Sequence, residues 1–119
     1  MIKNSYDSII PYTTKDGSEI RELLHPDRDG AARTSLAEAA VGPGRETRLH
    51  RHLRAEEIYH IAEGEGFLTL GDETIFVRKG DTVLIPPGEP HMVRNSGVAP
   101  LRIICCCSPA YSHEDTELM

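Results

Sequence analysis

Four residues with metal-binding side chains lie between positions 50 and 91 of the 119-residue chain. His50 and His52 are two residues apart, Glu57 follows, and His91 comes later. Residues i and i+2 of a strand leave the same face, so both imidazoles can converge on one ion. Glu57 and His91 begin two further expected strands and can reach the same point. Three imidazoles and a carboxylate suit one divalent transition metal per chain, with iron, manganese, nickel and zinc all possible.

Short strands are the elements that must position these side chains. Ten glycines and eight prolines separate short apolar segments, which is typical of an all-β fold. Gly71-Asp72 predicts a two-residue hairpin turn with glycine at positive φ. The alanine-rich segment 34–40 suits a helix or a strand equally, because Gly42-Pro43-Gly44 ends it early. We expect a sandwich or a closed barrel, with strands over residues 20–24, 35–41, 47–52, 57–61, 66–70, 73–77, 82–85, 91–94 and 101–107.

The chain length and charge limit the possible classes of protein. A chain of 119 residues corresponds to one domain. Residues 19–119 are expected to form it, while residues 1–18 are polar and irregular and are expected to wrap the domain or a dimer partner. Thirteen Lys and Arg against 19 Asp and Glu give a charge of −6, which disfavours nucleic-acid binding. We find no apolar run long enough to span a membrane and no signal peptide, so we expect neither a membrane partner nor export.

Two segments carry a family resemblance. GRETRLHRHLRAEEIYHIAEG, residues 44–64, and GDTVLIPPGEPHMVRN, residues 80–95, resemble the two signature motifs of the cupin superfamily. The 15 residues between them resemble the spacing of small single-domain bacterial cupins. The resemblance implies a double-stranded β-helix, or jelly-roll barrel, with a metal held inside by His50, His52, Glu57 and His91. It also implies a homodimer, since small cupins pair through sheet edges.

Some residues near the motifs are harder to assign. Glu56 is an alternative ligand, but Glu57 stands at the motif's interval of six residues before Gly64. Strand parity places Tyr59 on the inward face with Glu57, as a catalytic or substrate-binding residue or as barrel filling. The same parity places Arg48 on the face of His50, where it would bind an anionic substrate or remain solvated.

The three cysteines are consecutive, at positions 105, 106 and 107. If Arg102 is in water, strand alternation turns Cys105 and Cys107 inward and Cys106 outward. We expect them to pack as small apolar groups rather than to bind a metal or act as nucleophiles. With no other cysteine as a disulfide partner, a reducing cytoplasm is the expected compartment.

The remaining polar segments are expected at the surface. The acidic tail, residues 108–119, is expected to be frayed and to lie against the surface of the domain, without a role in the site. His25, His60 and His113 are expected to be surface histidines, although His25 and His113 are candidates to approach a barrel mouth.

These residues predict a metalloenzyme that acts on a small oxygenated molecule. Four protein ligands leave two adjacent positions on a six-coordinate ion, which suits a substrate that chelates the metal. The reaction is then that of a dioxygenase, or of a Lewis-acid isomerase, lyase or cyclase. Glu57 and Tyr59 are the candidate catalytic residues. The alternatives are a non-catalytic metal- and ligand-binding module and a purely structural barrel.

Overall fold

The protein is built almost entirely from short strands. The computed structural model describes residues 1–119 and contains two short helical segments, η1 (Tyr6–Ser8) and α1 (Pro26–Asp29). None of its helices has the length and apolar character needed to cross a membrane. The strands are β1 (Tyr12–Thr13), β2 (Glu19–Leu24), β3 (Ser35–Val41), β4 (His50–His52), β5 (Glu56–Glu63), β6 (Glu65–Leu70), β7 (Glu73–Arg78), β8 (Thr82–Ile85), β9 (His91–Asn95), β10 (Leu101–Ser108) and β11 (Thr116–Leu118).

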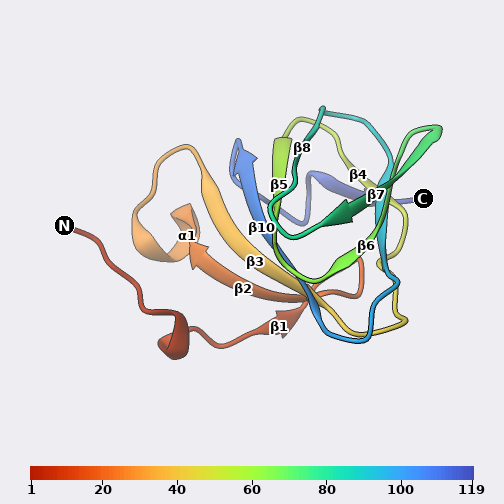
Figure 1. Ribbon diagram of the computed structural model, residues 1–119. Coiled ribbons are helices and arrows are strands. Elements are labelled where there is room, and N and C mark those ends of the chain that lie inside the picture. The colour runs from red at the N-terminus through yellow and green to blue at the C-terminus, as the bar shows by residue number, and fades with distance from the viewer.

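The strands form two antiparallel sheets that enclose a barrel, as expected. One sheet has the order β1-β2-β3-β10-β5-β8 and the other has the order β11-β4-β9-β6-β7. Figure 1 shows β1, β2 and β3 on one side of the molecule and β4, β6 and β7 on the other. The candidate metal ligands therefore come from both sheets, with β4 and β9 in one and β5 in the other.

The core lies between the sheets and follows the alternation of β5 and β10. In β10, Leu101, Ile103, Cys105 and Cys107 are buried, whereas Cys106 is only partly buried. This confirms the expected direction of the three cysteines, all of which are free. Alternate residues of a strand face opposite sides of its sheet, so β10 lines the barrel interior at every second position.

Two local expectations about turns and strands are resolved by backbone geometry. Gly71 has φ +59° in the two-residue turn that pairs Leu70 with Glu73, as expected for a hairpin. The alanine-rich segment is strand β3, which pairs with β2 and β10 on its two sides. Tertiary pairing therefore overrides the helix propensity of its alanines.

Three segments differ from the expectation. The strand expected over residues 47–52 begins only at His50, although Thr47 still contacts β9 through two hydrogen bonds of 2.9 Å with Val93. The first 18 residues, expected to be irregular, contain the two-residue strand β1, which pairs with β2 of the same chain. The tail expected to be frayed forms β11, which pairs with β4. Both chain ends therefore belong to the sheets that surround the site.

Candidate metal centre

Three histidines converge inside the barrel. His50 and His52 lie on β4, and His91 begins β9 directly opposite His50. One ring nitrogen from each of the three lies within 4.8 Å of those of the other two. All three are buried, and His91 is completely inaccessible. The i, i+2 spacing on β4 and the antiparallel register with β9 therefore bring the three imidazoles together as expected.

Hydrogen bonds determine which ring nitrogen of His50 and His91 carries a proton. Nδ1 of His50 lies 2.8 Å from the carbonyl oxygen of Arg48, and Nδ1 of His91 lies 3.0 Å from that of Glu89. A carbonyl only accepts, so each Nδ1 donates. In the neutral ring, Nε2 then carries the lone pair. His91 Nε2 is buried and has no hydrogen-bond partner, as expected for an atom that binds a metal.

Thr116 determines the same tautomer for His52. His52 Nδ1 lies 2.9 Å from Thr116 Oγ1, which itself donates to the carbonyl oxygen of Ser112 at 2.8 Å. Because the hydroxyl proton of Thr116 is used in that bond, Thr116 accepts from His52 Nδ1. All three neutral rings thus present an Nε2 lone pair.

Glu57 closes the group from the opposite sheet. Its Oε1 lies 3.1 Å from His52 Nε2 and 3.4 Å from His91 Nε2, and its Oε2 accepts a hydrogen bond from Cys107 Sγ at 3.1 Å. Burial alone would raise the pKa of Glu57. In the metal-free protein, however, rings of His52 and His91 that carry a proton on Nε2 donate to this carboxylate, and their hydrogen bonds and charge outweigh burial and lower its pKa to about 2. Glu56, the alternative residue, is exposed.

The donor set fits a divalent transition metal. Burial, and then the charge of His91, lower the pKa of His50 and so favour its neutral, ligating form. Three imidazole nitrogens and one carboxylate oxygen face one another, so a cation between them would offset their mutual repulsion. His50, His52, His91 and Glu57 are the residues that would hold it.

The two other residues expected at the site have different positions. Tyr59 lies in the cavity wall, with its ring centroid 5.9 Å from that of His91, and burial raises its pKa well above the usual value. Arg48 is exposed and does not line the cavity. Its expected direction was wrong because β4 begins at His50, so strand parity does not extend back to Arg48, and Thr47 is the buried residue beside it.

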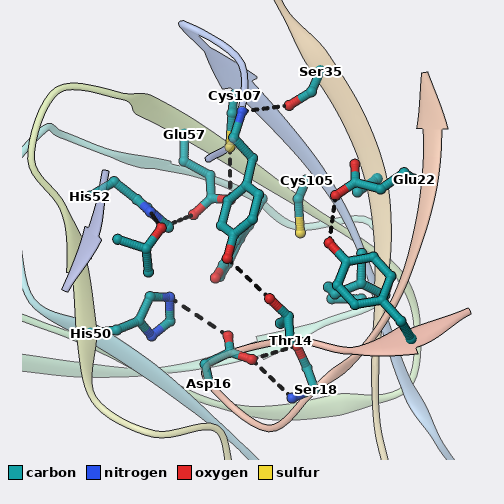
Figure 2. A pocket seen from close by; sticks show the side chains of 17 residues that line it. Thr14, Asp16, Ser18, Glu22, Ser35, His50, His52, Glu57, Cys105 and Cys107 are labelled. Carbon is teal, nitrogen blue, oxygen red and sulfur yellow. Dashed lines mark hydrogen bonds and ion pairs between the residues drawn. The ribbon is translucent and has the colours of Figure 1, made fainter. Parts of the chain in front are cut away.

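A small cavity opens beside the metal ligands, and Figure 2 shows the residues around it. The centres of water molecules can occupy a volume of about 40 Å³ inside it. This is enough for roughly three ordered waters. Residues from both chain ends contribute to its wall, which the sequence patterns did not predict: Tyr12, Thr14, Asp16, Ser18 and Glu22 from one end, and Tyr111 and Thr116 from the other.

Among these additional residues, Asp16 places a carboxylate close to a metal-binding nitrogen. Its Oδ2 lies 3.6 Å from His50 Nε2, while its Oδ1 accepts hydrogen bonds from Ser18 N at 2.9 Å and Ser18 Oγ at 2.6 Å. Asp16-Gly17-Ser18 resembles an ordinary polar turn in the sequence. No spacing signal therefore identified this carboxylate as part of the site.

The other three histidines lie outside the metal-ligand group. His60 is exposed and bonds Thr82 at 2.8 Å. His25 caps α1 by accepting from Asp27 N at 3.1 Å, and His113 lies 3.0 Å from the Tyr111 hydroxyl. His25 and His113 line an open basin at the surface, next to the cavity.

The barrel and its central histidines define a class of protein. The family model for the cupin domain matches residues 37–107, and the chain belongs to this family. The fold is the double-stranded β-helix found in solved cupin-like structures.

Three relatives illustrate the range of similar proteins. The chain is 56% identical to MJ1618, an uncharacterized protein of Methanocaldococcus jannaschii, over 100% of this chain and 95% of the relative. It is 32% identical to the polyketide synthase CurC of Streptomyces cyaneus, over 87% and 70% of the two chains. Among solved structures, the polyketide cyclase RemF of Streptomyces resistomycificus superposes with a TM-score of 0.79 at 26% identity, covering 97% of this chain and 89% of RemF.

Proposed function

We propose that this cupin is a metal-dependent enzyme that acts on a small oxygenated molecule by Lewis-acid chemistry of the isomerase, lyase or cyclase class. The observation that carries the proposal is the orientation of His50, His52 and His91. In each ring Nδ1 donates to a fixed acceptor, which leaves Nε2 as the nitrogen that can bind a metal. A divalent transition metal at such a site supplies Lewis acidity toward chelating oxygens, or dioxygen chemistry if it is redox-active.

The chain's own residues orient the ligands and control access. The backbone carbonyls that accept from Nδ1 of His50 and His91, and the Thr116 hydroxyl that accepts from His52, hold the three rings in one tautomer. Glu57 contributes a negative charge that moderates the charge of a bound ion. Tyr59 lies in the cavity wall, where its hydroxyl stays protonated and is available to contact a substrate.

Two observations support the substrate class and the reaction class. The cavity beside the histidines is narrow, which supports a compact substrate. The relatives named as a polyketide synthase and a polyketide cyclase support the cyclase class over oxidation. The free cysteines support a reducing compartment, and we propose the cytoplasm.

Metal analysis is the first test of this function. Protein purified without added metal is expected to contain one divalent transition ion per chain by elemental analysis. The double variant His50→Ala/His91→Ala should lose it, whereas His60→Ala, which removes an exposed histidine, should retain it. A folded double variant with full metal content would overturn the assignment.

Ligand screening then tests the reaction class. Small hydroxyketones, diols and hydroxy acids are screened by thermal shift with and without metal. A ligand at 1,000 times its dissociation constant stabilises the folded protein by about 4 kcal/mol. Stabilisation only with metal, followed by chemical change of the ligand without oxygen consumption, supports the proposal. Oxygen uptake would indicate a dioxygenase, and an unchanged ligand would indicate a non-catalytic binding module.

A further inference from the structure

The charged side chains that line the cavity are all acidic, apart from the histidines. Asp16, Glu22 and Glu57 contribute carboxyl groups, and neither lysine nor arginine lines the wall. A divalent ion together with three carboxylates leaves this enclosed space with a net negative charge. Charges interact strongly in such a space because little water screens them. The cavity therefore disfavours a substrate that brings further negative charge.

Glu22 has an unpaired oxygen. Its residue is buried, with 8% exposed, and its Oε1 accepts a hydrogen bond of 2.9 Å from the Tyr12 hydroxyl. Its Oε2 is also buried but has no hydrogen-bond partner. A buried acceptor without a donor is costly, so this oxygen suits a donor supplied by a ligand. Figure 2 shows Glu22 across the cavity from His50 and His52.

No basic side chain neutralises the Glu22 carboxylate. Arg28 lies nearby but donates at 3.2 Å to the backbone carbonyl of Glu22. Arg21, one residue earlier, lies nearest to the carboxylates of Glu19 and Glu38, at 3.5 and 3.9 Å. The carboxylate is therefore available to a ligand as both a charge and an acceptor.

Glu22 also lies next to the surface opening. Tyr12, Glu22 and Tyr111 line both the cavity and the open basin beside it. A ligand that enters from this basin passes the Glu22 carboxylate before it reaches the histidines. Asp16, 3.6 Å from His50 Nε2, then places a second negative charge at the metal end.

Resting on the proposed function, we propose that Glu22 and Asp16 select the substrate by charge. The substrate chelates the metal through two oxygens at one end and carries a hydroxyl or ammonium donor at its other end, which Glu22 Oε2 accepts. Compounds with a second negative charge at that remote end, such as dicarboxylates, are excluded. Glu22 is a substrate-specificity residue in this assignment, and Asp16 reinforces the selection through its charge.

Hydroxamates with one common chelating group test the selection by binding alone. Acetohydroxamate carries hydrogen at its remote carbon, whereas glycolohydroxamate carries hydroxyl, glycine hydroxamate carries ammonium and malonomonohydroxamate carries carboxylate. Their affinities for zinc-loaded protein are measured by calorimetry. The hydroxyl and ammonium compounds should bind more tightly than acetohydroxamate, and the carboxylate compound should bind at least about tenfold more weakly.

Matched variants distinguish the effect of these two carboxylates on binding from the effect of the protein's overall charge. In Glu22→Gln/Asp16→Asn, the ratio between the ammonium and carboxylate affinities should shrink by at least about tenfold. Glu19→Gln removes an exposed carboxylate from the same strand and should leave the ratio unchanged. A zinc content of one ion per chain, measured by elemental analysis, shows that the double variant keeps its metal site. If that variant does not fold, the ranking in the wild-type protein decides.

Two outcomes are distinguishable failures. Wild-type protein that binds the carboxylate compound as tightly as the ammonium compound would overturn the charge selection and leave the metal-dependent function standing. Acetohydroxamate that binds equally well without metal would overturn the proposed function, and the selection with it.

Discussion

The thiol of Cys107 donates a hydrogen bond to Glu57, with Sγ 3.1 Å from Oε2. This contact crosses from β10 to its neighbour β5, where Cys107 and Glu57 are paired in register. It leaves Oε1, the oxygen nearest His52 and His91, directed toward the histidines. Cys107 therefore orients a candidate metal ligand, a role beyond the simple packing expected from the sequence.

Cys107→Ala should weaken metal binding by roughly tenfold, because Oε2 of Glu57 loses its hydrogen-bond donor and the carboxylate is no longer held in one orientation. Cys107→Ser keeps a donor at this position and should retain most of the affinity. Cys106→Ala changes the adjacent, outward-facing residue and should have no effect. Competition against a chelator of known affinity measures all three, and equal affinities for Cys107→Ala and wild type would contradict the orienting role.

The thiols should react with a chromogenic thiol reagent in two groups. Burial raises the pKa of Cys105 and of Cys107, and the Glu57 carboxylate raises both further, so both remain unreactive thiols at neutral pH. Cys106 is only partly buried. We expect at most one thiol to be titrated in native protein and all three after denaturation. Three rapidly reacting thiols in the native protein would contradict this arrangement.

Thr116→Val should reduce metal affinity by about 10- to 100-fold, because it removes the acceptor that holds His52 Nδ1–H. Thr116→Ser keeps that acceptor and should bind metal almost as tightly as wild type. Isothermal titration with zinc gives both affinities. If valine and serine behave alike, β11 contributes only backbone pairing to the site.

The free energy of unfolding of the metal-free protein should fall in two stages as the pH is lowered. The pKa of His50 is lower in the folded protein, so below about 6.5 the unfolded chain binds more protons and stability declines. The pKa of Glu57 falls from 4.5 to about 2 on folding, so its contribution, present above 4.5, is lost toward pH 2. Urea titrations across this pH range measure both stages.

A matched variant identifies the first stage. His50→Gln should flatten the decline that begins near pH 6.5, whereas His60→Gln, at an exposed position, should preserve it. Constant stability between pH 7 and pH 5 in the wild-type protein would show that His50 is not held neutral by burial.

The homodimer expected from the sequence has a candidate surface on the outer face of β5 and β8. Ile58 and Leu84 are paired in register there and are 39% and 53% exposed, and β8 is an edge strand. Light scattering should give twice the chain mass of 13.2 kDa. Leu84→Glu should produce monomer, whereas Val98→Glu, in an exposed loop, should not. A wild-type mass near 13.2 kDa would contradict the prediction.

The central ligands were predictable because their signals are local. His50 and His52 share a face through the two-residue period of a strand, and Glu57 and Tyr59 share another in the same way. The directions of Cys105, Cys106 and Cys107 follow from the same alternation. The alternation within a strand does not indicate at which residue the strand begins. Arg48 was therefore assigned to a face that β4, beginning at His50, does not extend to include.

The sequence by itself determined a barrel of short strands with three histidines and a carboxylate directed inward. Only the tertiary structure determined the rest of the cavity wall, because β1, β2 and β11 bring residues from the chain ends to the central motifs. Thr116 contacts His52 from 64 positions away, and Asp16 reaches His50 from a turn. Single polar residues carry no periodic pattern, and long-range strand pairing decides whether they face water or the metal ligands.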